Sequence, residues 1–524
     1  MMARAMFAPL GVAAVLVLSV AAADAAPFRC GRIGGDFVFG QEANVNSLDQ
    51  MASNTISTRN IAMNIFEALM TRDENNNPIT DLAESYAESP DRMVYTFKIR
   101  QGVTFHNSKK LTSADIIASW DRYAKVGMER GMFVNVDRWE APDPATFVIT
   151  MKKPQPTFIE LISSFSVPIV IAPAEDRDDA TMQLKTVGTG PFQLVEFLPG
   201  SHVKLKRFDG YTPNTKYEDR TGFGGYRQAC VDTVTVRIVT EPGARVAGLK
   251  TGELQGVEDL PTKSLEELKK DRNVTILPLL NWWVQVSLPN TAVAPTDNVL
   301  FRRAVQAVLD MDEVMDAATD GNYKLNVGFQ YPNQPSYSDA GRDTYNLKDP
   351  AKAKALLAQS GYKGEPVVLL TNKDYASMYN AALVMAEQMK SIGIKAELRV
   401  VDWSTSVNMQ LKPDTGWNFF FTGYGTQPAL GALATMQFFM PPNANYKPKG
   451  DVSDPDLQAA WTDMNQQPEL KDRVAAYGRM QQVIADKAYA FPFGSLTKVQ
   501  GVRANVEGFK PFRIPRFSNV WLKN

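Results

Sequence analysis

The amino-acid sequence predicts an α/β fold that is divided into two or three lobes. The chain has 524 residues, which is too many for a single hydrophobic core. In the first half, apolar and polar residues alternate in short runs between 193 and 239, as they do in half-buried strands. In the second half, residues 367–400 show a strand, a helix and a second strand with short connections. This pattern is a βαβ unit and indicates a parallel sheet.

Most of the elements expected in the first half are strands. The clearest runs over residues 95–99, where aromatic and aliphatic residues alternate with polar ones. A turn at Gly102 follows, and Thr112 or Ser113 then caps an amphipathic helix. The other elements that we expect are a helix over 60–69 and strands at 37–39, 146–151, 193–197, 203–206 and 234–239.

Helices bounded by recognisable caps dominate the second half. Asp297 or Asn298 can cap a helix with one apolar face, and Pro350 begins another helix that ends before Gly361. The βαβ unit is expected to comprise a strand at 367–370, a helical stripe over 382–392 that ends at Gly393, and a strand at 394–400. A further strand is expected at 417–422.

Composition and the N-terminal residues indicate an exported protein. The formal net charge is −1, so no basic field favours nucleic acid or an anionic membrane surface. Residues 1–25 combine a weak positive start at Arg4, an apolar run from Met6 to Val20, and small residues that suit cleavage after Ala25. We expect a cleaved signal peptide and a periplasmic location; an uncleaved membrane anchor is the alternative.

The sequence has two cysteines, Cys30 and Cys230. In an oxidising compartment a disulfide is the simplest expectation, and two buried free thiols are the alternative. The bridge would close a 200-residue loop, for which the chain-entropy model gives about 5 kcal/mol as an upper figure.

Enzymatic motifs are missing from the sequence. The two histidines, His106 and His202, lie in unrelated segments without metal-ligand spacing. The sequence contains neither a Gly-x-Ser-x-Gly elbow nor a Walker loop. We therefore predict no catalytic residues, no metal and no cofactor, and a secreted hydrolase stands as the alternative.

Aromatic residues at strand ends are the better functional lead, because ligands of open α/β sheets bind outside the carboxyl ends of the strands. Asp402 and Trp403 directly follow the second strand of the βαβ unit, and Tyr424 follows the strand at 417–422. Packing against the core is the alternative role for both aromatic residues. Trp282 and Trp283 are neighbours on a probable strand and are expected to point to opposite sides.

A series of motifs along the chain resembles one family. The strand-turn-helix 95–116 resembles the signature of the family 5 extracytoplasmic solute-binding proteins, the peptide-binding subunits of ABC importers. Five further segments resemble family motifs in the same order: Ser47-Leu-Asp49, Asp81 to Asp91, Gly188-Thr-Gly-Pro-Phe192, Phe301 to Val305, and Asp349 to Tyr362 with Ile392-Gly-Ile394.

The resemblance implies a two-lobed, type II-like periplasmic-binding-protein clamp with an additional domain inserted into its first lobe. The hinge crossings would lie near Leu288–Pro289 and Phe491–Pro492, and closure would bury the ligand. The closed monomer would dock on the permease subunits of an ABC transporter. The domain ranges would be 26–60, 188–288 and 488–524 for the first lobe, 61–187 for the inserted domain and 289–487 for the second lobe.

The loop after Tyr424 departs from the family pattern. In peptide-binding members this loop resembles Trp-x-x-Asp, whose carboxylate pairs with the α-ammonium of the ligand, whereas this chain has Gln427 there. An amide supplies no charge, so opine-like conjugates or a glycoside become alternatives to a peptide. A sensor that does not transport is a further alternative. The ligand-binding residues that we predict are Trp403, Tyr424, Gln427, Asp402, Glu42 and Asn44.

Overall fold

A computed structural model describes residues 27–176, 184–332, 334, 336–425, 433–436, 439–440 and 453–523. The predicted signal peptide and Gln427 lie outside the described residues. No helix among the described residues is long and apolar enough to cross a membrane.

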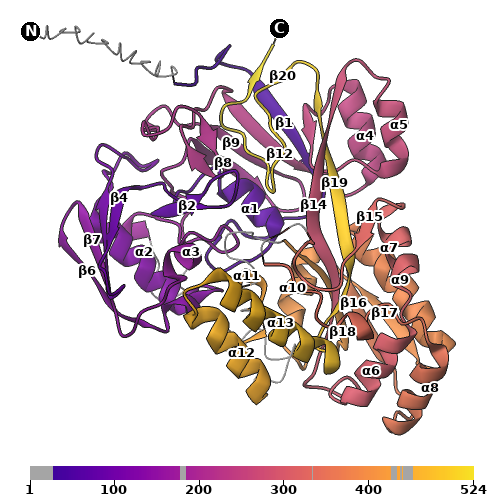
Figure 1. Cartoon of the computed structure of the whole chain (residues 1–524). Coiled ribbons are helices and arrows are strands. Elements are labelled where there is room, and N and C mark those ends of the chain that lie inside the picture. Colours follow the sequence, from indigo (N-terminus) through magenta and orange to yellow (C-terminus); the bar gives the residue numbers. More distant parts are fainter. Residues whose placement is uncertain are drawn as a thin grey trace, which may run out of the picture.

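One long mixed sheet connects the two ends of the molecule (Figure 1), in the order β17-β16-β18-β14-β19-β13-β1-β12-β9-β8. A short strand, β15, also pairs with β19. The strands of this sheet are β1 Asp36–Gln41, β8 Phe192–Leu198, β9 His202–Arg207, β12 Thr233–Ile238, β13 Gly256–Val257, β14 Val274–Pro289, β15 Tyr323–Leu325, β16 Val367–Thr371, β17 Ala396–Val400, β18 Phe419–Tyr424 and β19 Phe491–Arg503.

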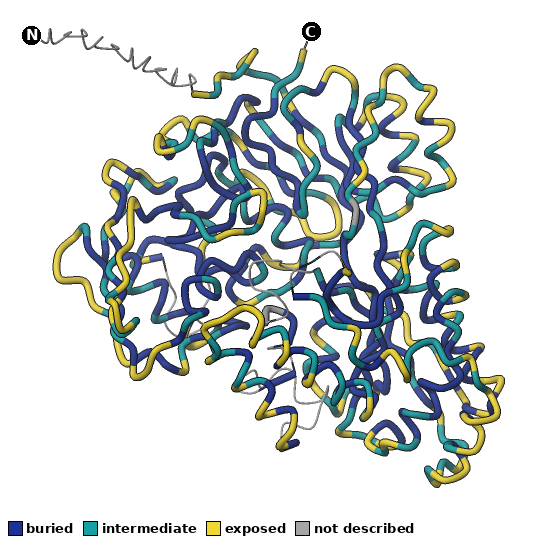
Figure 2. The backbone as a smooth tube through the Cα atoms, viewed as in Figure 1, coloured by how far each residue is buried: buried dark blue, intermediate teal, exposed yellow. Residues whose placement is uncertain are grey.

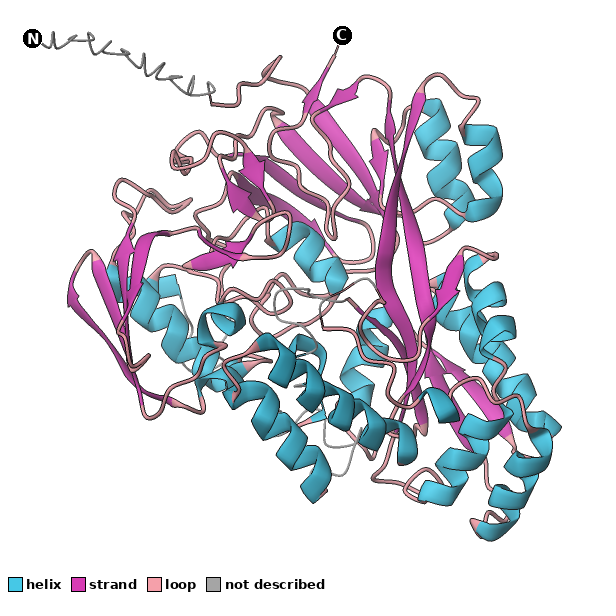
Figure 3. Ribbon diagram, in the orientation of Figure 1, coloured by secondary structure: helices cyan, strands magenta, loops and turns pink. Residues whose placement is uncertain are grey.

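Helices gather around both halves of this sheet (Figure 3). The α-helices of the described residues are α1 Ile56–Ala62, α2 Ser113–Val126, α3 Phe158–Ile162, α4 Pro242–Thr251, α5 Leu265–Leu268, α6 Val299–Val308, α7 Met311–Thr319, α8 Pro350–Gln359, α9 Ala376–Ser391, α10 Trp403–Gln410, α11 Leu433–Met436, α12 Pro455–Gln466 and α13 Leu470–Asp486. Of the expected caps, Asn298 holds the N-terminus of α6 by accepting from the backbone amides of Leu300 and Phe301.

The predicted βαβ unit is confirmed. β16 and β17 pair in parallel, and α9 connects them with its apolar face buried. Gly393 has a φ of +97°, a backbone conformation that suits glycine and ends the helix. β18 then pairs in parallel with β16, so the carboxyl ends of these three strands lie at the same edge of the sheet.

The helix predicted over 60–69 begins earlier and ends at Ala62. Backbone hydrogen bonds from a distant segment explain the early end. The amide of Gly190 donates to the carbonyl of Ile65 at 2.8 Å, and that of Phe192 donates to the carbonyl of Asn64 at 3.2 Å. A continuing helix would need these carbonyls for its own bonds, so the tertiary contact replaces the helical one.

Residues 83–151 form a separate four-stranded sheet at one side of the molecule, in the order β4-β5-β7-β6 (Figure 1). The strand predicted at 95–99 is β5, and its alternating apolar residues are buried. Thr112 caps α2 in a reciprocal capping box with Asp115. This sheet is compatible with the predicted inserted domain, and the limits of that domain stay a prediction. The strands of the four-stranded sheet are β4 Ala83–Glu88, β5 Val94–Ile99, β6 Val136–Asp143 and β7 Thr146–Met151.

Three small hairpins complete the described strands. They are β2 Met70–Arg72 with β3 Pro78–Thr80, β10 Arg220–Thr221 with β11 Gly224–Gly225, and β20 Val506–Glu507 with β21 Trp521–Leu522.

The strands β14 and β19 run side by side through both halves of the long sheet. Beyond Trp283, β14 also pairs with β18, whereas β19 pairs with β13 only near its other end. A register shift separates the two halves of β14, between Leu279 and Trp283. The segments predicted as hinges, Leu288–Pro289 and Phe491–Pro492, pair within the second half of the sheet, and the lobe boundaries stay a prediction.

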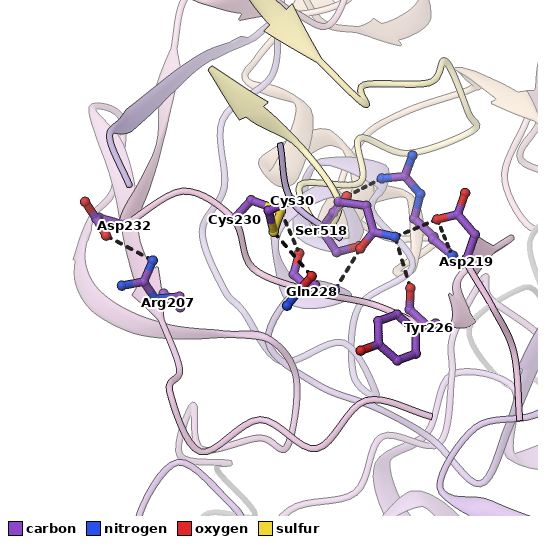
Figure 4. Close-up of a disulfide and its surroundings, with 10 residues drawn as sticks. Cys30, Arg207, Asp219, Tyr226, Gln228, Cys230, Asp232 and Ser518 are labelled. Carbon is purple, nitrogen blue, oxygen red and sulfur yellow. Dashed lines mark hydrogen bonds and ion pairs between the residues drawn. A yellow bond between two sulfur atoms is a disulfide. The ribbon is translucent and has the colours of Figure 1, made fainter. Parts of the chain in front are cut away.

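A disulfide joins Cys30 to Cys230, with 5.6 Å between their Cα atoms (Figure 4), so the predicted pairing is present. The C-terminal segment is fixed beside it. Asn519 accepts from the backbone amide of Gln228 at 2.7 Å and donates to the carbonyl of Tyr226 at 3.0 Å. The bridge therefore ties the first described residues to the same region that holds the C-terminus.

Buried backbone runs through the centre of the molecule (Figure 2), and most residues of β19 are buried. Both β14 and β19 lack an exposed face here, which explains why polar residues such as Gln285, Lys498 and Gln500 are buried within them.

Candidate ligand-binding cleft

Trp282 and Trp283 form an aromatic wall at the centre of the molecule, where β14 changes register. Their ring centroids lie 5.9 Å apart, and both residues line the two cavities described below. The expectation that they point to opposite sides is therefore wrong. Asn281 has a φ of +53°, and the register shift at this point breaks the alternation of a regular strand.

The cavity on one side of the wall, which we call the arginine chamber, has a volume of about 90 Å³. It is several times larger than the roughly 15 Å³ that one water molecule needs. Its described lining comes from β14 and β18 of the sheet, from α1, α9, α10 and α11, and from residues 165–166 and the C-terminal segment. The lining residues are Asn54, Ile56, Arg59, Phe165, Ser166, Trp282, Trp283, Met378, Trp403, Val407, Gln410, Phe420, Thr422, Gly423, Tyr424, Gly425, Thr435 and Arg513.

Trp403 and Tyr424, both predicted from strand ends, line this chamber. Trp403 opens α10, and its ring stacks on Phe420 with centroids 6.1 Å apart. Tyr424 ends β18 and meets the ring of Phe329 edge-on. The indole Nε1–H groups of Trp403 and Trp282 have no hydrogen-bond partner among the described residues, although the two side chains are only 6% and 3% exposed. Both indoles can therefore donate to a ligand.

Two guanidinium groups, those of Arg59 and Arg513, line the arginine chamber. Arg59 on α1 is positioned by donating to the carbonyls of Asn54 at 2.9 Å and Ser166 at 2.7 Å. The guanidinium carbon of Arg513 lies 5.0 Å from the ring centroid of Phe165. Burial lowers the pKa of Arg513 to about 10, so this group is still charged at neutral pH.

Gly425, at the end of β18, lies directly against Arg513. A Cβ atom at this position would stand 1.4 Å from Nη2 of the guanidinium group. Glycine is therefore what allows Arg513 of the C-terminal segment to reach the strand end in the other lobe.

The cavity on the other side of the tryptophan wall, which we call the acidic chamber, has a volume of about 120 Å³. It lies between β19, α4 and the start of α9. Its ionisable lining groups are four carboxylates and two cations: Glu42, Asp259, Asp320, Asp374, Arg245 and Lys498.

Lys498 on β19 is the centre of a buried charge cluster. Its Nζ donates to Glu258 at 3.1 Å and to Glu42, and it lies 4.8 Å from the ring centroid of Trp282. Burial raises the pKa of the Glu42 carboxyl to about 7, partly offset by the positive charge of Lys498. For Lys498, burial lowers the pKa, but Glu258 and Glu42 outweigh it and leave the pKa above its ordinary value.

Asp374 lies between the start of α10 and the loop after β1. Its Oδ2 accepts from the backbone amide of Trp403 at 3.0 Å, and the nearby backbone of Asn44 lowers the pKa of its carboxyl group. Burial raises the pKa of Asp374 above its ordinary value. This carboxylate therefore links the loop after β1 to the start of α10.

A family model described as bacterial extracellular solute-binding proteins, family 5, matches residues 77–446, which is more than half of the chain. The chain belongs to this family. The predicted family and the predicted α/β, two-lobed clamp are thus both confirmed.

Relatives of family 5 match along nearly the whole chain. A probable peptide ABC transporter periplasmic-binding protein of Sinorhizobium fredii is 27% identical over 495 residues, covering 91% of this chain and 92% of the relative. The glutathione-binding protein GsiB of Salmonella typhi is 26% identical over 493 residues, covering 90% and 91%.

Solved family 5 structures show the same fold. A dipeptide-binding protein from a Pseudoalteromonas species, in complex with Met-Leu, matches with a TM-score of 0.82 at 18% identity, over 93% of this chain and all of the other. The binding protein AgaA of A. tumefaciens, in complex with agropinic acid, matches with a TM-score of 0.80 at 22% identity, over 94% and 99%.

The other predicted site residues of this family 5 chain, Asp402, Asn44, Glu42 and Gln427, have different positions relative to the cleft. Asp402 caps α10 by accepting from the amide of Thr405 at 3.0 Å. The side-chain oxygen of Asn44 accepts from the amide of Gly200 at 2.9 Å. Neither residue lines the two chambers, Glu42 lines the acidic chamber, and Gln427 lies outside the described residues.

Four cleft residues were not predicted from the sequence: Arg59, Asp374, Lys498 and Arg513. Lys498 could have been recognised from the sequence, because a charged residue within the largely apolar strand β19 is unusual and indicates a buried partner of opposite charge. Arg513 stands between Phe512 and Ile514 in the C-terminal segment, and nothing local shows that it reaches Gly425.

Proposed function

We propose that this protein is the exported receptor subunit of an ABC importer, that it binds a peptide or peptide-like small solute between its lobes, and that it delivers the solute to a membrane permease. One observation supports this above others. A cleft with unpaired indole donors lies where β14 and β19 cross between the lobes of a family 5 chain. The periplasm is the proposed location, because the relative from Sinorhizobium fredii is named as a periplasmic-binding protein.

Binding would act by closing the clamp. Trp403 and Tyr424 contribute from the second lobe and Arg59 from the first, so a solute that touches all three holds the lobes together. The free energy of these contacts favours the closed form, and the permease would recognise that form. Gln427 would donate a hydrogen bond to one end of the solute. Glu42, Asn44 and Asp402 would shape the cleft through the contacts described above.

An opine-like conjugate is the second candidate solute. No carboxylate is found among the described lining residues of the arginine chamber, beside the loop that would hold an α-ammonium group in peptide-binding members. A solved structural relative also has agropinic acid as its ligand. A solute without a free α-ammonium group fits this lining.

A receptor without catalytic activity fits the described chemistry better than a hydrolase does. His106 is held between the backbone of Gly188 and Gly190, and His202 pairs with Glu196. Neither histidine lines the described cavities, so neither is placed to act as a general base on a bound solute.

The test is native mass spectrometry of gently purified protein, followed by release and identification of the co-purifying solute. We expect one peptide-like solute at high occupancy, released unchanged. A protein that carries no solute, and takes up none from a cell extract, would overturn the receptor proposal, and turnover of the solute would favour a hydrolase.

Gln427→Asp tests the role of the loop after Tyr424. Adding a carboxylate there should strengthen binding of a simple dipeptide with a free amino end by about tenfold, measured by isothermal titration calorimetry. Gln410→Glu, at another lining position, serves as the matched control. Equal affinity of wild type and Gln427→Asp would mean that this loop does not meet the amino end.

A further inference from the structure

A small cavity lies against the C-terminal segment, and none of its described lining residues lines the two chambers of the cleft. We call it the triple-arginine cavity. Its lining comes from the residues after α1, the β10–β11 hairpin and residues 514–518. Its volume of about 10 Å³ is close to the roughly 10–15 Å³ that one water-sized sphere needs. It therefore suits one water molecule or one monatomic ion.

Three arginines line this cavity, and its described lining contains neither aspartate nor glutamate. Arg220, Arg227 and Arg516 are 6%, 4% and 5% exposed, so solvent scarcely screens their charges. Burial and the positive charge of Arg516 lower the pKa of Arg220 to about 9, and the group therefore still carries its charge at neutral pH.

Ion pairs neutralise two of the three guanidinium groups. Arg227 donates to the carboxylates of Glu67 and Asp81. Arg516 donates to the carboxylate of Glu74. These carboxylates are engaged by the two arginines that they contact, and none of them lines the triple-arginine cavity.

Arg220 has no such partner. Its guanidinium group donates to backbone carbonyl oxygens, among them that of Ser518 and that of Gly508 at 3.0 Å. No carboxylate among the described residues makes an ion pair with this side chain. The neighbouring carboxylate of Asp219 accepts from Asn519 instead. One buried positive charge is thus left without a contacting counter-charge, which is costly unless an anion supplies it.

Two buried N–H groups of the lining residues also have no acceptor. The Nε–H groups of Arg227 and Arg516 have no hydrogen-bond partner among the described residues. A guanidinium nitrogen can only donate, so the group that satisfies both must be an acceptor. A water molecule can accept from both, but it leaves the charge of Arg220 uncompensated. A monatomic anion accepts from both and supplies the negative charge.

We propose that the triple-arginine cavity binds one chloride ion or another small halide. The ion accepts hydrogen bonds from the Nε–H groups of Arg227 and Arg516 and balances the charge of Arg220. Because the lining includes residues 514–518 and the β10–β11 hairpin, the ion also joins the C-terminal segment to this hairpin. The site is separate from the cleft and does not depend on the proposed solute-binding function.

The first experiment compares the melting temperature of the protein in chloride, bromide and isethionate at equal ionic strength. Isethionate is too large for the cavity, so we expect chloride and bromide to raise the melting temperature above it by about 1–2 °C. Arg220→Gln should abolish this difference. Arg72→Gln is the matched control, because Arg72 is also buried and donates to backbone carbonyls but does not line the cavity. It should keep the difference, even where it lowers the melting temperature itself.

The second experiment locates the ion in the wild-type protein and needs no variant. Crystals grown in bromide should show an anomalous peak in the triple-arginine cavity, within about 3.5 Å of the two Nε atoms. A cavity of the same volume whose lining includes Glu67 and Asp81 is the internal control and should show no peak, because its carboxylates repel an anion.

Several outcomes would overturn the halide site. They are a cavity that holds only water, bromide found at surface positions as an adventitious ion only, and equal melting temperatures in chloride and isethionate. A halide effect that persists unchanged in folded Arg220→Gln would also contradict the proposal. Each of these results would leave the solute-binding proposal untouched.

Discussion

Replacing Lys498 with methionine tests the buried charge cluster at the crossing strands. The side chains of Lys498, Glu258 and Glu42 are 2%, 1% and 7% exposed, so solvent cannot replace the lost ammonium group. Removing one partner of such a buried pair costs about 3–5 kcal/mol, because the remaining carboxylates are left without a counter-charge. We expect this loss in the free energy of unfolding of Lys498→Met at pH 8.

The loss should shrink as the pH falls. Without Lys498, burial raises the folded-state pKa of Glu42 further above about 7, while the unfolded value stays near its ordinary 4.5. A raised carboxyl pKa gives stability that is fully present below the unfolded pKa and is lost as the pH rises through the folded pKa. Both proteins lose this contribution alike up to about pH 7, so the difference between wild type and Lys498→Met should grow above about pH 7 and be larger at pH 8 than at pH 5.

Urea unfolding followed by tryptophan fluorescence measures both effects, since Trp282 lies against the cluster. The double variant Glu42→Gln/Lys498→Met should recover part of the loss, with a coupling of about 0.5–3 kcal/mol. Lys390→Met, at an exposed lysine, should leave stability unchanged within error. A loss below about 1 kcal/mol at pH 8, or a loss independent of pH, would refute the reasoning.

Two other predictions concern stability alone. Replacing Cys30 and Cys230 with serine should lower the free energy of unfolding by up to about 5 kcal/mol, and urea curves that coincide with those of wild type would contradict this. Gly190→Ala would place a Cβ atom 2.6 Å from a backbone carbonyl and should cost about 1–3 kcal/mol. A Cβ atom at Gly243 in α4 would meet open space, so Gly243→Ala should instead stabilise the protein by up to about 1 kcal/mol. The melting temperatures of the two glycine variants measure both effects.

Elements specified by neighbouring residues could be predicted from the sequence. The alternation in β5, the cap at Asn298 and the βαβ unit around α9 each depend on interactions within a few residues. Trp403 and Tyr424 were also predictable, because the carboxyl ends of parallel strands share one edge of the sheet. Local periodicity and one topological rule were enough to place these two side chains.

Features that depend on distant segments could not be predicted in this way. The helix expected over 60–69 ends at Ala62 because the carbonyls of Asn64 and Ile65 bond to a segment more than a hundred residues away. The two tryptophans face one cleft because regular pairing of β14 with β19 is interrupted between Leu279 and Trp283, where Asn281 has a positive φ. Neither effect leaves a mark in the local hydrophobic pattern.

The contrast between local and long-range interactions also explains why the charges around the cleft could not be predicted from the sequence. Gly425 and Arg513 are 88 positions apart in the sequence. The need for a glycine at position 425 is evident only in the folded chain, where the guanidinium group lies against it. Asp374 and Asn44 likewise meet only when both lobes are folded. Because each of these contacts joins segments that are distant in the sequence, the charges around the cleft come together only in the folded chain, and no local pattern of residues reports them.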